Sequence, residues 1–216
     1  MGTKEEILEQ AMHRQKDGYT SAKLKVSNLN FDEAAEVIDQ LKDQFRLRID
    51  VNRAWTKAGS LHFFSQFALD AFDYVEEPFK NPKELREFTH PLAIDESFPA
   101  DLSLHEMEEL PTLKALIYKP TIQGGRSMCS FLSKWAAERK IDLVLSSSFE
   151  TDLGLAHIAA MAHRFSLSAP VGIGTYHYLN ELVCEPPLRF SGPIVSIPTQ
   201  LEPSLFRESH RSTASK

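Results

Sequence analysis

Short apolar segments alternate with amphipathic ones along most of the chain. Seven runs have the branched and apolar side chains typical of buried β-strands. These runs cover residues 22–26, 47–51, 72–76, 92–95, 115–119, 142–146 and 170–174. Between them, apolar residues recur every three or four positions, which predicts helices with one buried face. These helices are expected at residues 4–15, 31–45, 59–72, 125–139 and 151–165.

The spacing of the strands narrows the fold class. Their last polar or glycine residues lie 19–27 residues apart, which is room for one strand, one helix and two loops. Eight such βα units close into a parallel barrel of roughly 200–250 residues. We therefore predict an α/β protein with seven recognisable barrel strands over residues 1–198, followed by a polar C-terminal tail at 199–216.

Composition and charge exclude several classes of protein. The chain has 216 residues, of which 42% are hydrophobic, so it can bury a sizeable core. Its net charge of −6 argues against a nucleic-acid binder, and no apolar run is long enough to predict a membrane-spanning helix. Two cysteines without a CxxC pair and a polar, acidic start favour the reducing cytoplasm.

Charged residues end five successive predicted strands: Lys25, Asp50, Glu76, Asp95 and Lys119. The carboxyl ends of barrel strands converge on one mouth, where three carboxylates would repel one another. A hard divalent cation removes that repulsion, and carboxylate oxygens suit Mg²⁺. We therefore predict a Mg²⁺ site made by the three acids, with a lysine on either side that can move protons. A single such acid is more often a helix cap, and a single such lysine more often reaches solvent, so the prediction depends on all five occurring together.

Six segments, in this order, resemble the muconate-lactonizing subgroup of the enolase superfamily. Lys23-Leu24-Lys25 resembles its KxK strand, and residues 48–55, 75–78 and 93–97 resemble its three metal-binding strands. Residues 117–120 resemble the lysine strand opposite the KxK strand. Residues 146–155 resemble the serine strand of the o-succinylbenzoate synthases within that subgroup.

The resemblance implies an enolase-type barrel and a carbon–oxygen lyase. The expected reaction is the Mg²⁺-dependent dehydration of a 2-succinyl-cyclohexadiene carboxylate to o-succinylbenzoate, a step of menaquinone biosynthesis. It begins with removal of a proton next to a carboxylate. Asp50, Glu76 and Asp95 would hold the Mg²⁺, which stabilises the enediolate that forms.

The resemblance also implies roles for the lysines and for three residues near the end of the barrel. Lys25 would remove the proton and return one to the departing hydroxyl, and Lys119 would stabilise the intermediate or act as the opposite-face base. Lys23 would support Lys25, because two ammonium groups this close disfavour double protonation and lower a pKa. The residues expected to contact the second carboxylate of the substrate are Ser146, Ser148 and Gly172.

Two alternatives remain open from the sequence. One is an N-acylamino-acid racemase or dipeptide epimerase of the same subgroup. Epimerases typically carry an acid pair in the last barrel strand, whereas residues 172–175 read Gly-Ile-Gly-Thr, which favours a substrate without an amine there. The other alternative is an inactive barrel fragment.

The resemblance implies that full-length members of the subgroup have an N-terminal capping domain followed by the barrel. The capping domain and the first barrel strand have no counterpart in the expected elements of this sequence. A start assigned too late, a split gene and a decayed remnant are three competing explanations. A split gene would make a separate, cap-supplying chain a partner. Open sheet edges would instead favour self-association.

Overall fold

The computed structural model describes residues 2–198 and 202–203. The predicted polar tail at 199–216 therefore lies almost wholly outside the described residues. The chain forms two compact units, of which the first ends at Leu116 and the second begins at Ile117. Each unit is described by itself below.

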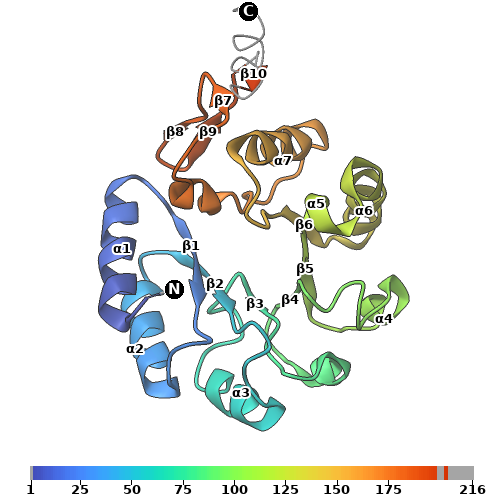
Figure 1. The fold of residues 1–216 in the computed structure, drawn as a ribbon. Helices are drawn as coiled ribbons and strands as arrows, with labels where there is room; N and C mark the ends of the chain where they lie inside the picture. Colours follow the sequence, from blue (N-terminus) through green and yellow to red (C-terminus); the bar gives the residue numbers. More distant parts are fainter. Residues whose placement is uncertain (1, 199–201, 204–216) are drawn as a thin grey trace, which may run out of the picture. The chain divides into compact units, whose positions relative to one another are not determined.

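The first unit consists of strands and helices in alternation. Its elements are α1 (Lys4–Lys16), β1 (Ser21–Lys25), α2 (Phe31–Leu41), β2 (Arg46–Asp50), α3 (Lys57–Phe64), β3 (Tyr74–Glu76), a 3₁₀ helix η1 (Pro82–Glu87), β4 (Leu92–Ile94), α4 (Leu104–Glu108) and most of β5 (Leu113–Tyr118). The strands pair in parallel in the order β1-β2-β3-β4-β5 (Figure 1). This confirms the predicted parallel βα units.

The register of the sheet brings three strand ends into line. Lys25 is the partner of Asp50, and Asp50 is the partner of Glu76. Glu76 in turn pairs with Ala93, two residues before Asp95. Because side chains two residues apart on a strand share a face, the predicted acids and Lys25 belong to one edge and one face of the sheet.

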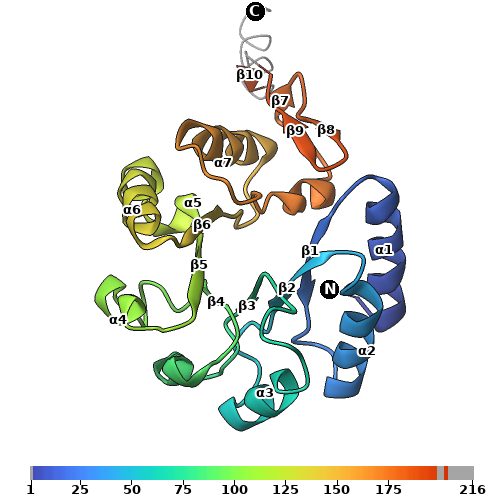
Figure 2. The same ribbon diagram turned by 180° about the vertical axis from the view of Figure 1, so that it is seen from behind.

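Helix caps and apolar faces explain why the first helices form where they do. Thr3 with Glu6, and Asn30 with Glu33, form capping boxes at the starts of α1 and α2. The two helices lie side by side (Figures 1 and 2), and Lys4 donates to Glu36 between them. Within the described residues, none of the helices combines the length and the apolar character needed to cross a membrane.

The second unit begins with the last residues of β5. It continues with α5 (Pro120–Gln123), α6 (Gly125–Arg139), β6 (Asp142–Leu145), α7 (Asp152–Arg164), a 3₁₀ helix η2 (Gly174–Tyr178), β7 (Cys184–Glu185), β8 (Arg189–Ser191), β9 (Ile194–Ser196) and β10 (Glu202–Pro203). Just beyond β6, the Ser146 N–H donates to the Tyr118 carbonyl at 2.9 Å, so β6 neighbours the end of β5. The short antiparallel pairs β8-β9 and β7-β10 were not predicted from the sequence.

The seventh predicted strand, at 170–174, is reduced to a single parallel bridge between Ser146 and Gly172. Pro170 has no N–H to donate, which weakens the strand before the bridge. At Gly174 the chain turns into η2. A Cβ at Gly172 would lie 2.7 Å from the Ser146 Oγ, so the two segments approach closely because this residue is glycine.

Aromatic rings pack α3 against the sheet of the first unit. Phe64 contacts Phe72, Phe88 and the ring of His90. The His90 Nε2 lies 3.3 Å from the Phe67 carbonyl, and its Nδ1 has no hydrogen-bond partner among the described residues. Burial lowers the pKa of His90, and only the backbone contacts oppose this shift.

We expect His90 to make the first unit less stable in mild acid. Its pKa is lowered in the folded state, so below pH ~6.5 the unfolded chain takes up a proton that the folded chain does not. Stability should fall with decreasing pH by at most about 1.4 kcal/mol per pH unit from this residue. Urea unfolding between pH 7.5 and 5.5 should show a shallower decline for His90→Leu than for wild type. The exposed His105→Gln variant serves as control, and equal slopes for all three proteins would contradict the assignment.

Candidate active site

Three carboxylates lie buried at the ends of β2, β3 and β4. Asp50 ends β2, Glu76 ends β3, and Asp95 follows β4 directly. Their exposed fractions are 1%, 0% and 3%, respectively. Burying an ionised carboxylate costs several kcal/mol unless positive charge or hydrogen bonds offset the loss of water.

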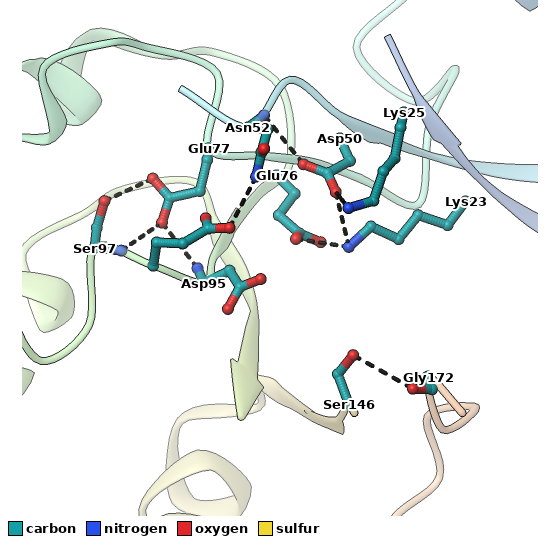
Figure 3. A network of polar contacts seen from close by, with 11 residues as sticks. Lys23, Lys25, Asp50, Asn52, Glu76, Glu77, Asp95, Ser97, Ser146 and Gly172 are labelled. Atoms are coloured by element: carbon teal, nitrogen blue, oxygen red, sulfur yellow. Dashed lines mark hydrogen bonds and ion pairs between the residues drawn. The ribbon is translucent and has the colours of Figure 1, made fainter. Parts of the chain in front are cut away.

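Two lysines of β1 supply positive charge to this cluster (Figure 3). The Lys23 Nζ lies 2.7 Å from the Glu76 Oε1 and 3.0 Å from the Asp50 Oδ2. The Lys25 Nζ lies 3.6 Å from the same Asp50 oxygen. Burial lowers the pKa of Lys23, but Glu76 and Asp50 together outweigh it, so the pKa is raised. Lys23 is therefore held protonated, and its expected support of Lys25 stays a prediction.

Only one oxygen of the Glu76 carboxyl is held by Lys23. Its Oε2 has no hydrogen-bond partner among the described residues. Burial, together with the charges of Asp50 and Asp95, raises the pKa of Glu76 to about 8, although Lys23 lowers it. The three acids therefore interact with one another. With two ammonium groups nearby, the cluster keeps a net negative charge when all its groups are ionised.

The chemistry of this cluster fits an oxygen-liganded divalent cation such as Mg²⁺. It offers three buried carboxylates, and the Glu76 Oε2 has no hydrogen-bond partner among the described residues. Nevertheless, no group of three or more Asp, Glu, His or Cys side chains in the described part of the chain is arranged to hold an ion directly. The Lys23 ammonium contacts Asp50 and Glu76 instead, and it provides the positive charge that a cation would provide. The ligand set of Asp50, Glu76 and Asp95 thus stays a prediction.

The segments that follow these strands hold residues without a predicted role. Asn52, Arg53 and Glu77 have φ values of 53°, 57° and 45°, in the left-handed region that non-glycine residues seldom adopt. The Glu77 carboxylate accepts hydrogen bonds from the backbone of Asp95 and from Ser97. The sequence signal for Glu77 is a second acid directly after Glu76, at the end of a buried strand.

The second unit carries the other predicted site residues. Lys119 is the N-cap residue of α5, and its N–H donates to the Gln123 Oε1 at 2.6 Å. Ser146 and Gly172 lie against each other, with the Ser146 Oγ donating to the Gly172 carbonyl at 3.4 Å. Their predicted roles toward a substrate stay predictions.

Ser148 is engaged by an acid that the sequence did not single out. Its N–H and its hydroxyl both donate to Glu150, at 2.7 Å each. Glu150 also accepts from the Thr121 hydroxyl. The intervening residue, Phe149, is 75% exposed and has a φ of 65°. Both donors of Ser148 are therefore occupied here, so a carboxylate bound by this residue would compete with Glu150.

Comparison with known proteins gives this arrangement a context. The family model described as "Enolase C-terminal domain-like" matches residues 6–202. The o-succinylbenzoate synthase of Pasteurella multocida is 26% identical over 198 residues, covering 86% of this chain and 59% of that protein. The o-succinylbenzoate synthase of Edwardsiella ictaluri is 34% identical over 147 residues, covering 64% of this chain and 44% of that protein.

The fold is shared with solved structures. MenC from Desulfotalea psychrophila superposes with a TM-score of 0.74 at 24% identity, covering 91% of this chain and 58% of that chain. The chain thus spans roughly half the length of these relatives. The match confirms the predicted fold class.

We expect Lys23 to contribute more stability than Lys25. Lys23→Met leaves Asp50 and Glu76 buried without their closest positive charge, and should lower the free energy of unfolding by about 3 kcal/mol. This is the lower end of the range for a broken buried ion pair, since the Lys23 side chain is 34% exposed. Lys25→Met removes one 3.6 Å contact and should lower it by less than about 1 kcal/mol.

Urea unfolding in the presence of a chelator measures both losses. Excess Mg²⁺ should restore part of the stability of Lys23→Met, because the cation replaces the missing charge. An equal decrease in the free energy of unfolding for the two variants would show that the Lys23 contacts stabilise the fold no more than the Lys25 contact does.

Proposed function

The chain belongs to the enolase C-terminal domain-like family, and on that premise we propose that it carries the catalytic barrel of an o-succinylbenzoate synthase. The proposed reaction is the Mg²⁺-dependent dehydration of a 2-succinyl-cyclohexadiene carboxylate to o-succinylbenzoate, a step of menaquinone biosynthesis. The names of the curated relatives support this choice of reaction.

One observation supports the proposal above the others. Lys25, Asp50 and Glu76 occupy the same row of three neighbouring parallel strands. A basic group and two carboxylates are thus placed side by side at the carboxyl edge of the sheet, the edge where parallel α/β enzymes carry out their chemistry. Asp95 follows at the end of the next strand.

The three acids would hold the cation, and the cation would supply positive charge that stabilises the anion formed when a proton leaves the carbon next to a carboxylate. The two lysines of β1 have different roles in the proposed reaction. Lys23, tied to Asp50 and Glu76, keeps the acids in place and holds its own proton. Its fixed contacts make it a poor proton carrier.

Lys25 is better placed to carry the proton. Its side chain is 43% exposed, and its contact with Asp50 is longer than either contact of Lys23. An ammonium with a single, loose partner can reach a substrate and exchange protons more readily than one held by two carboxylates. In the proposed reaction, the neutral amine of Lys25 removes the proton, and the ammonium so formed delivers that proton to the departing hydroxyl, so that water is lost.

The remaining predicted residues are proposed to bind the substrate. Lys119 would stabilise the negative charge of the intermediate, and Ser146, Ser148 and Gly172 would contact the second carboxylate of the substrate. These four roles come from the resemblance to the synthases and stand as proposals.

We also propose that the enzyme works in the cytoplasm. Cys129 and Cys184 are both buried and free. Free thiols fit a reducing compartment, where disulfides rarely persist.

A direct assay tests the proposed function. The full chain is incubated with the cyclohexadiene substrate and Mg²⁺, and the appearance of o-succinylbenzoate is followed. In parallel, a chiral N-acylamino acid is incubated in heavy water. Product formation supports the synthase. Deuterium exchange without dehydration would identify a racemase of the same family, and neither activity together with no response to Mg²⁺ would identify an inactive barrel.

Lys25→Ala should lower turnover by roughly 10²–10⁴-fold, the range for loss of a general acid–base group. Its affinity for Mg²⁺ should stay close to wild type, because Lys25 binds only one oxygen of one acid. Steady-state kinetics and a calorimetric Mg²⁺ titration measure the two quantities. Lys42→Ala, at a surface lysine paired with Asp39, is the control. Undiminished turnover in Lys25→Ala would remove this residue from the proton transfer.

Asp95→Asn should weaken Mg²⁺ binding by more than about tenfold, since a neutral amide replaces a buried charged ligand. The matched control is Asp101→Asn, because Asp101 pairs with Arg53 in a neighbouring but more exposed position. Isothermal titration with Mg²⁺ compares the two variants. If Asp95→Asn binds Mg²⁺ as tightly as Asp101→Asn, then Asp95 is not a ligand.

A further inference from the structure

Glu77 is a buried acid that the proposed reaction does not use. It follows Glu76 directly and is 0% exposed. In Figure 3 the Glu76 carboxylate points toward Lys23, whereas the Glu77 carboxylate points toward Ser97 and the backbone of Asp95. The Glu77 Oε1 accepts the N–H groups of Asp95 and Ser97, both at 2.9 Å, and its Oε2 accepts the Ser97 hydroxyl at 2.6 Å.

The hydrogen bond from the Asp95 N–H to the Glu77 side chain replaces one backbone hydrogen bond between β3 and β4. The Val75 N–H donates to the Pro91 carbonyl, and the Glu77 N–H donates to the Ala93 carbonyl. In a regular parallel ladder, the next bond would run from the Asp95 N–H to the Glu77 carbonyl. Here the Glu77 side chain accepts that N–H instead.

The left-handed backbone of Glu77 explains why its side chain, and not its carbonyl, accepts the Asp95 N–H. With a φ of 45°, Glu77 turns its carbonyl to accept the Arg53 N–H at 3.0 Å. A left-handed residue other than glycine costs roughly 1–3 kcal/mol, so surrounding contacts must offset it. Glu77, directly after β3, thereby forms hydrogen bonds with the segments that follow β2 and β4. These are the strands that place Asp50, Glu76 and Asp95.

Glu77 cannot readily act as a fourth metal ligand. Both of its oxygens already accept hydrogen bonds, and three donors from the loop after β4 surround them. Its effect on a bound cation would therefore pass through the backbone of Asp95. A shift of the Asp95 N–H moves the Cα from which the Asp95 carboxylate projects.

We propose that Glu77 is a positioning residue that holds Asp95 in register with Glu76 and so sets the affinity of the site for a divalent cation. This inference rests on the metal site of the proposed function. Residues that orient metal ligands by hydrogen bonding typically affect metal affinity by about 10–100-fold when replaced.

Two replacements of similar length separate positioning from charge. In Glu77→Gln the Oε1 can still accept both N–H groups, and the amide nitrogen can donate to the Ser97 Oγ. Glu77→Met fills similar space and accepts neither N–H. Mn²⁺ is the probe, measured by titration and by the electron paramagnetic resonance spectrum of the bound ion. We expect near-wild-type Mn²⁺ affinity and spectrum for Glu77→Gln, and a 10–100-fold weaker affinity with an altered spectrum for Glu77→Met.

Asp152 provides the matched control for lost stability. It is also a 0% exposed carboxylate, and it accepts two backbone N–H groups, from Val183 and Cys184, at 3.0 Å each. It lies in the second unit, which carries none of the three acids. Asp152→Leu should lower stability without changing Mn²⁺ affinity. Ser97→Ala removes only the hydroxyl contact, folds with less risk than Glu77→Met, and should weaken Mn²⁺ binding by a smaller factor.

The outcomes distinguish failure of the proposed metal site from failure of the positioning role of Glu77. If wild type binds no Mn²⁺, the proposed metal site is wrong and the role of Glu77 falls with it. If wild type binds Mn²⁺ but Glu77→Met and Ser97→Ala bind it with unchanged affinity and spectrum, the positioning role alone is overturned. A loss of affinity in Glu77→Met that Glu77→Gln does not show supports the proposal.

Discussion

Three carboxylates share one buried edge of a parallel sheet, and the cost of keeping them there is the constraint on which the rest of the site depends. Asp50, Glu76 and Asp95 are each at most 3% exposed, so water offsets little of their repulsion. Two lysines on the adjacent strand offset part of this repulsion, and the closer one, Lys23, contacts two of the acids. The same excess of buried negative charge is the feature on which the proposed divalent-cation site depends.

The spacing of apolar residues along the chain predicted most of the fold, because the need to bury these residues determines that spacing. The helix expected at 125–139 matches α6 in both bounds. The helix expected at 59–72 ends at Phe64 instead. Phe67 and Phe72 still pack against each other, with their rings 5.3 Å apart, but they do so from an irregular segment. Apolar spacing thus identified which residues are buried, while the backbone conformation that buries them depended on the tertiary contacts.

The site was predictable to the extent that it depends on strand ends. Lys25, Asp50 and Glu76 were expected together because each ends a strand, and the register places them in one row. Glu77 was not predicted, since its role needs a left-handed backbone and a side chain that takes over a bond of the ladder. Neither feature leaves a periodic signal. The pairing of Ser148 with Glu150 was missed for the same reason, because it is a local turn contact.

A crystal of the protein soaked with Mn²⁺ tests the central claim most directly. The anomalous signal of Mn²⁺ locates the ion independently of any assumption about its ligands. We predict one strong peak with oxygens of Asp50, Glu76 and Asp95 within about 2.3 Å of the ion. An absent peak, or a peak bound away from these three acids, would contradict this prediction.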